Sequence, residues 1–136
     1  MIVHKFAAFS DGSHRGACAA AILNDSNEIM AVNAARRPSR WLTAGAMELA
    51  GVSLQLDMAA ELVEALALPI ADTIELVCYG DNEPVMEMCC AANDPSVCTN
   101  MGASHLSSLV ECVNDRAANF RSGGALCCIC GPESKA

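Results

Sequence analysis

Residues 2–13 read IVHKFAAFSDGS, and this stretch decides the fold that we expect for the chain. Its first eight residues are mostly apolar and its last four favour a turn, as in a buried strand that runs directly into a turn. Residues 16–24 and 28–35 are two further apolar stretches, and an Asp-Ser-Asn turn separates them. Three strands joined by short turns predict an antiparallel meander.

A helix and a fourth strand are expected after the meander. Residues 53–68 carry apolar side chains at helical spacing, with Ser53 as the cap and Pro69 as the stop. A short helix around residues 46–50 is also compatible with the sequence. Residues 73–79 (TIELVCY) are typical of a buried strand. The strand–helix–strand order indicates a crossover connection, so we expect this strand to pair in parallel within the sheet.

The last third of the chain predicts two more helices and a final strand. Pro84 opens a short helix that reaches about residue 92, and residues 104–120 form an amphipathic helix with one apolar stripe. Residues 125–130 (ALCCIC) form the last strand. We therefore predict one α/β domain over residues 1–136, with a five-stranded mixed sheet flanked by helices. The order is strand, strand, strand, helix, strand, helix, helix, strand.

The composition favours a cytoplasmic protein with a real core. Apolar residues make up 53% of the 136 residues, yet no apolar run approaches the ~18 residues of a membrane span. The N-terminus lacks the features of a signal peptide. The nine cysteines cannot all pair internally because their number is odd, and we expect mostly buried thiols. The net charge of −8 argues against general nucleic-acid binding, but not against a nuclease in which a metal supplies the positive charge.

Three aspartates are predicted to meet at one end of the sheet. Asp11 follows the first strand, Asp81 follows the fourth, and Asp57 lies in the first turn of the helix between them. If the first and fourth strands are neighbours, both ends lie at the edge where functional residues of open α/β sheets collect. Close carboxylates repel each other unless a cation binds them, and oxygen ligands suit magnesium. We therefore predict a catalytic site for Mg²⁺ or Mn²⁺, in which two ions about 3.5–4 Å apart promote phosphodiester hydrolysis.

Polar and basic side chains near these acids are predicted to contact nucleic acid. The only basic cluster of the chain also contains a tryptophan, which could stack on a base while the arginines hold phosphates. The alternative is an ordinary solvated loop with an anchoring tryptophan. The predicted contact residues are Ser13, His14, Arg36, Arg37, Arg40, Trp41 and Asn82.

The same residues resemble a known family. Phe9-Ser10-Asp11-Gly12-Ser13 resembles the "TDGS" signature on the first strand of ribonuclease H, and Tyr79-Gly80-Asp81-Asn82 resembles its "TDS" step after the fourth strand. The stretch from Gln55 to Leu66 resembles its first helix. This resemblance implies a ribonuclease H-like fold and magnesium-dependent cleavage, classically of the RNA strand of an RNA–DNA hybrid. It also implies that Asp11, Asp57 and Asp81 are the metal ligands.

Glu48 is a rival for the role given to Asp57, because Met47-Glu48-Leu49 copies the "MEL" of the family literally. We prefer Asp57 because it lies 24 residues before Asp81, which leaves room for one helix and a turn. From Glu48 the gap is 33 residues, and Gly51 and Ser53 are expected to interrupt the helix.

Two other functions fit the sequence. The fourth carboxylate of the family and its basic helical handle for the hybrid have no clear counterpart here, which suits a non-catalytic interaction or assembly domain of the same fold. A resolvase- or integrase-like nuclease would use the same carboxylates on DNA. Self-association into a homo-oligomer is compatible with either function, and no membrane partner is expected.

Overall fold

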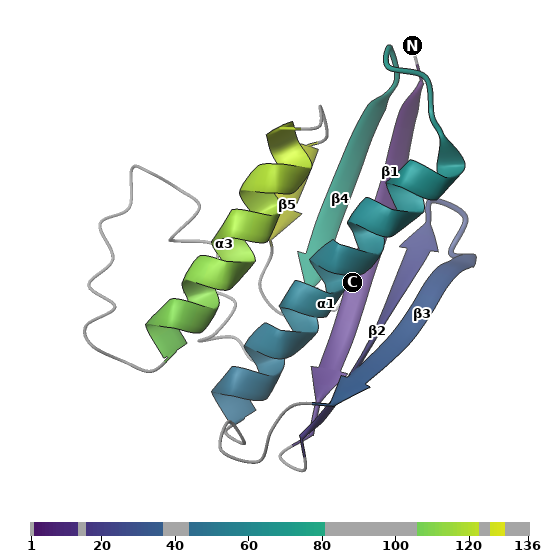
Figure 1. Cartoon of the computed structure of the whole chain (residues 1–136). Helices are drawn as coiled ribbons and strands as arrows, with labels where there is room; N and C mark the ends of the chain where they lie inside the picture. The colour runs from purple at the N-terminus through teal and green to yellow at the C-terminus, as the bar shows by residue number, and fades with distance from the viewer. Residues whose placement is uncertain (1, 14–15, 37–43, 81–105, 123–125, 130–136) are drawn as a thin grey trace.

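In the computed structural model of this chain, the described residues are 2–13, 16–36, 44–80, 106–122 and 126–129. They form five strands and two helices in the order β1, β2, β3, α1, β4, α3, β5 (Figure 1). The elements are β1 (Val3–Gly12), β2 (Ala17–Asn24), β3 (Ile29–Arg36), α1 (Ala44–Leu66), β4 (Thr73–Tyr79), α3 (Leu106–Ser122) and β5 (Leu126–Ile129).

The five strands form one mixed sheet in the order β3-β2-β1-β4-β5. The first three strands pair antiparallel, which confirms the predicted meander. β4 pairs in parallel with β1 from Val3–Thr73 to Phe9–Tyr79, and β5 pairs in parallel with β4. The first and fourth strands are therefore neighbours, as the predicted site requires.

Strand β1 extends further than its apolar stretch predicts. Asp11 and Gly12 still pair with Ala19 and Cys18 of β2, so Asp11 lies within the strand and not after it. The turn begins only at Ser13, whose N–H donates to the carbonyl of Ala17.

Helix α1 begins at Ala44 and runs unbroken through Gly51 and Ser53 to Leu66, so the predicted start at Ser53 is wrong. Gly51 is not a helix breaker here. A Cβ atom at this position would lie 2.7 Å from Ser10 Oγ, so the absence of a side chain allows α1 to pack tightly on β1. Ser53 is buried inside the helix instead of capping it. The short segment expected at 46–50 belongs to this one long helix.

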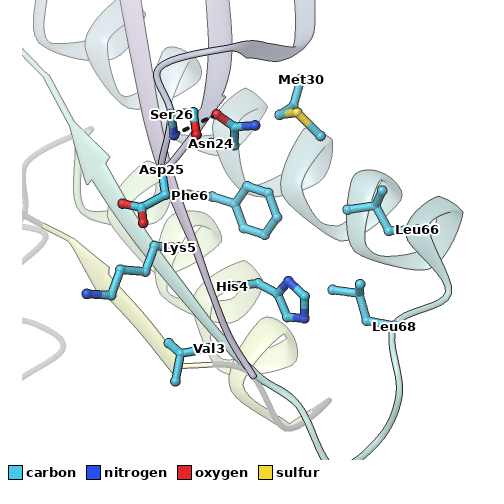
Figure 2. Close-up of a pocket in the computed structure, with 10 residues that line it drawn as sticks. All are labelled: Val3, His4, Lys5, Phe6, Asn24, Asp25, Ser26, Met30, Leu66 and Leu68. Carbon is cyan, nitrogen blue, oxygen red and sulfur yellow. Dashed lines mark hydrogen bonds between the residues drawn. The ribbon is translucent and has the colours of Figure 1, made fainter. Parts of the chain in front are cut away.

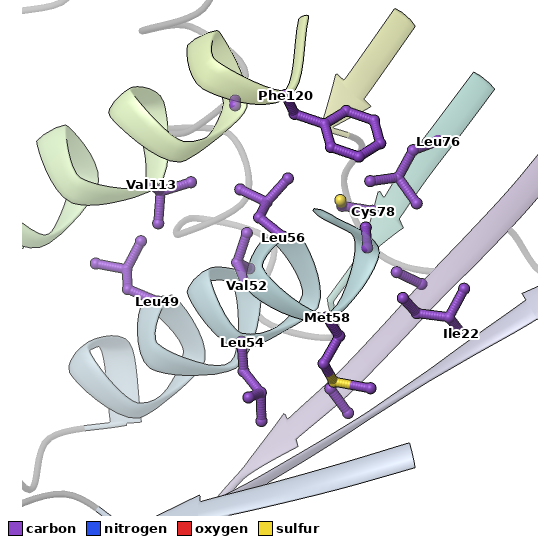
Figure 3. Packing of buried hydrophobic residues seen from close by; sticks show 14 of the residues in the cluster. Ile22, Leu49, Val52, Leu54, Leu56, Met58, Leu76, Cys78, Val113 and Phe120 are labelled. Atoms are coloured by element: carbon purple, nitrogen blue, oxygen red, sulfur yellow. The ribbon is translucent and has the colours of Figure 1, made fainter. Parts of the chain in front are cut away.

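The core lies between the sheet and the two helices, which pack beside each other on one face of it (Figures 1 and 3). Alternate residues of β1, β2 and β4 point into it, because successive side chains of a strand face opposite sides. The stripe predicted on α3 is confirmed by its buried residues Val110, Val113, Ala117 and Phe120.

Among the three cysteines whose burial the structure describes, two behave as predicted and one does not. Cys18 and Cys78 are buried in the core, whereas Cys112 on α3 is exposed. None of the helices among the described residues has the length and apolar character needed to cross a membrane. The helix predicted from Pro84 to residue 92 lies outside the described residues.

Candidate active site

Helix α1 packs very closely on the sheet at the end of β1, where Gly12 lies against Met47. A Cβ atom on Gly12 would lie 2.8 Å from both the Cβ and the carbonyl oxygen of Met47. Contacts this short do not occur between real Cβ atoms and backbone, so residue 12 must be glycine for α1 to lie where it does. Asp11 immediately precedes this contact on the strand, and Glu48 immediately follows it on the helix.

Glu48 is therefore the acid that α1 brings to the end of β1. Its residue is only 4% exposed, whereas Asp11 is exposed at the end of its strand. Ser10 and Gly12 face α1, so strand alternation directs Asp11 toward the opposite face of the sheet. One Asp11 oxygen, Oδ1, accepts a hydrogen bond of 3.0 Å from the N–H of Gly12.

Asp57 lies elsewhere on the same helix. It follows Glu48 by nine residues, which is about 2.5 helical turns and about 13 Å along the axis. The half turn places Asp57 on the other side of α1, where it is exposed and Oδ1 accepts a hydrogen bond of 2.9 Å from Arg116 Nε on α3. The structure thus does not bring Asp57 to Asp11.

Asp81 lies outside the described residues, but the strand that leads to it is described. Phe9 and Tyr79 are register partners in β1 and β4, and their rings stack at 5.0 Å. Asp11 and Asp81 each follow this pair by two residues in the sequence. Within the described part of the chain, no three His, Cys, Asp or Glu side chains are close enough to hold a metal ion.

The comparisons with solved structures identify the fold. The sequence itself matches no protein-family model and no curated protein. The LC11 ribonuclease H1 in complex with an RNA/DNA hybrid superposes with a TM-score of 0.67 at 11% identity, over 94% of this chain and 86% of that chain. This chain has a ribonuclease H-like fold. The foamy viral protease–reverse transcriptase in complex with an RNA/DNA hybrid matches with a TM-score of 0.58 at 10% identity, over 97% of this chain and 18% of that chain.

Only two of the residues predicted to contact nucleic acid are described in this ribonuclease H-like fold. Ser13 closes the connection from β1 to β2, and Arg36 is exposed at the last position of β3. Because β3 runs in the same direction as β1, Arg36 lies at the same end of the sheet as Asp11. The other five, which lie outside the described residues, are His14, Arg37, Arg40, Trp41 and Asn82.

Sequence reasoning missed one buried polar residue at this end of the ribonuclease H-like sheet. Gln55 on α1 is 0% exposed, and its Nε2 donates to Ser10 Oγ at 2.6 Å and to the Tyr79 carbonyl oxygen at 2.8 Å. The signal in the sequence was its spacing, since Gln55 follows Glu48 by seven residues and lies on the same side of the helix.

Proposed function

We propose that the chain is a divalent-metal-dependent nuclease that cleaves the RNA strand of RNA–DNA hybrids. The observation that carries this proposal is the contact of Gly12 with Met47, which brings Glu48 to the end of the strand that holds Asp11. The likeness of the fold to two structures with bound hybrid supports the choice of substrate. In the proposal, Asp11, Glu48 and Asp81 are the metal ligands, and Glu48 takes the role that the sequence alone assigned to Asp57.

The donor set fits magnesium. All three proposed ligands are carboxylates, and hard divalent cations bind such oxygens in preference to nitrogen or sulfur. Carboxylates that converge at this end of the sheet would repel each other, so a bound cation would stabilise them. When bound, Mg²⁺ or Mn²⁺ would supply positive charge to the scissile phosphate and lower the pKa of the attacking water.

The residues of the chain would orient the substrate around that centre. Asp11 is exposed and would face the nucleic acid, while the buried Glu48 is held by the packing of α1 and would keep its position through turnover. Arg36 at the end of β3 would bind a backbone phosphate by charge-assisted hydrogen bonds, and Ser13 could donate its hydroxyl to another. Arg36 would partly offset the net charge of −8 where the strand approaches.

The proposal is tested with labelled RNA–DNA hybrid, duplex DNA and single strands, each incubated with Mg²⁺ or Mn²⁺. We expect cleavage of the RNA strand of the hybrid, and a cleavage rate more than about 100-fold lower in Asp11→Asn. Even the loss of a residue that only orients a metal ligand lowers metal affinity or activity by about 10–100-fold. Cleavage of duplex DNA alone would instead indicate a resolvase-like nuclease. Equal cleavage by the wild type and Asp11→Asn would contradict the proposal.

A second candidate function is a non-catalytic interaction domain, which the edge of the sheet favours. β3 is the outermost strand on its side, and its Ile29 and Val32 are 67% and 68% exposed. An exposed apolar edge strand is a template for pairing with another chain. Absence of cleavage, together with no rise in melting temperature on adding Mg²⁺ or Mn²⁺, would favour this function.

A further inference from the structure

Gln55 joins the ends of the two central strands. The last paired residues of β1 and β4 among those described are Phe9 and Tyr79. Just beyond that pair, Gln55 donates one hydrogen bond to the Ser10 hydroxyl and one to the Tyr79 carbonyl. A side chain of α1 thus connects the strands at the point where their ladder ends.

The chemistry of the two partners fixes the orientation of the amide. The Tyr79 carbonyl can only accept, so the NH₂ group of Gln55 must face it. Both N–H groups are then used, and Oε1 is buried without a partner among the described residues. A buried amide with one unpaired atom is unfavourable for stability, and an apolar side chain of similar shape would avoid that penalty.

The two residues that accept hydrogen bonds from Gln55 lie next to candidate metal ligands in the sequence. Ser10 directly precedes Asp11, and Tyr79 lies two residues before Asp81. We propose that Gln55 is a positioning residue, which sets the separation of the two strand ends that carry these acids. This inference rests on the proposed nuclease function, and it adds a residue that touches neither metal nor substrate.

The same side of α1 carries the third acid. Gln55 follows Glu48 by two helical turns, and Gly51 lies between them. Ser10 occupies the space that a side chain on Gly51 would take. Gly51 leaves the Ser10 hydroxyl the space it needs to reach Gln55, since a Cβ would lie 2.7 Å from Ser10 Oγ. One rigid helix face therefore places Glu48 and also holds the strands of the other two acids.

The test compares Gln55→Met with a matched control. Methionine is unbranched and similar in length to glutamine, but it donates no hydrogen bond. The control is Leu56→Val, a change at the adjacent buried residue, which points toward α3 and away from the strand ends (Figure 3). Binding of Mn²⁺ is measured by calorimetry without substrate, and kcat and KM are measured on the hybrid as a function of Mg²⁺.

For Gln55→Met we expect the Kd for Mn²⁺ to rise and kcat to fall by about tenfold each, in the range seen for groups that orient metal ligands. The KM for the hybrid should change less than about twofold, since phosphate contacts are untouched. Leu56→Val should leave both Kd and kcat within about twofold of wild type. If Gln55→Met does not fold, Ser10→Ala takes its place, because it keeps the hydrogen bond from Gln55 to Tyr79. In Ser10→Ala the Kd for Mn²⁺ should rise and kcat should fall by about threefold each.

The outcomes separate this inference from the function on which it rests. A wild type that neither binds Mn²⁺ nor cleaves would end both proposals. A wild type that does both, with Gln55→Met (or Ser10→Ala) and Leu56→Val behaving alike, would overturn the positioning role and leave the nuclease intact. A change in KM alone would also overturn it, because it would indicate a contact with substrate.

Discussion

The two ends of the β1–β4 strand pair are built in different ways. At the end that holds Asp11, α1 approaches so closely that a methyl group on Gly12 would collide with the backbone of Met47. The two strands are joined there by hydrogen bonds that the fully buried, uncharged side chain of Gln55 donates. We call this the site end.

The opposite end is open and charged. A cavity of about 290 Å³ lies between the start of β1, the turn after β2 and the end of α1, with His4, Phe6, Met30, Leu66 and Leu68 around it (Figure 2). Here β1 is joined to the segment before β4 by a partly exposed hydrogen bond, in which His4 Nε2 lies 2.8 Å from Asp72 Oδ2.

The two ends therefore differ in how closely helix α1 packs against the strands. Close packing transmits a displacement to the neighbouring atoms, whereas an open cavity leaves room for it. A change at the site end should therefore move whole elements, and a change at the opposite end should be tolerated. Asp11 and Glu48 belong to the closely packed end of the strand pair.

The largest expected effect comes from adding a methyl group at the site end. Gly12→Ala forces α1 away from β1, because the atoms it meets include the carbonyl oxygen and carbonyl carbon of Met47, which cannot rotate away. We expect the free energy of unfolding, measured in urea, to fall by about 3 kcal/mol, in the upper part of the range for overpacking.

The matched control adds atoms to an exposed strand position. Ala34→Val on the edge strand β3 should change the free energy of unfolding by less than about 0.5 kcal/mol, as surface substitutions usually do. Equal effects of Gly12→Ala and Ala34→Val would show that the site end is not closely packed, and the comparison of the two ends would fail.

A smaller effect is expected at the opposite end, and it depends on pH. The hydrogen bond with His4, helped by one from the N–H of Ile2, holds the pKa of Asp72 below its ordinary value of 3.8. A carboxyl whose pKa is lowered by folding stabilises the fold above its unfolded pKa, and this stabilisation is lost as the pH falls through the folded pKa.

The measurement is the difference in unfolding free energy between wild type and Asp72→Asn. Wild type should be modestly more stable at about pH 5, and the difference should shrink as the pH falls below the unfolded pKa of Asp72. A difference that grows toward low pH would have the wrong sign and would contradict the assigned role of Asp72.

The sequence was sufficient for the sheet but not for the helix against it. Apolar stretches and turn residues predict each described strand, and the crossover rule predicts that β4 runs parallel to its neighbour. The predicted helix start at Ser53 was wrong because glycine weakens a helix in general, whereas here Gly51 permits close packing on Ser10. A single sequence does not separate these two uses of glycine, because the difference lies in what the neighbouring strand presents.

The error at Gly51 also decided the preference for Asp57 over Glu48. With the helix starting at Ser53, Asp57 appeared to lie in its first turn and Glu48 outside it. With the helix starting at Ala44, Glu48 lies within it, directly after the Met47 that packs on Gly12, and Asp57 lies on the other side of the helix with Arg116. Gln55 was missed because a polar residue within an apolar helix gives no sign of its partners, which come from Ser10 and Tyr79 far along the chain.

The most direct test of the account compares Glu48→Gln with Asp57→Asn on the RNA–DNA hybrid in Mg²⁺. We expect Glu48→Gln to lose more than about 100-fold of the cleavage rate, because it removes a proposed metal ligand. Asp57→Asn should stay within about threefold of wild type, since it removes only an exposed ion pair. Full activity in Glu48→Gln, with loss in Asp57→Asn, would contradict the account.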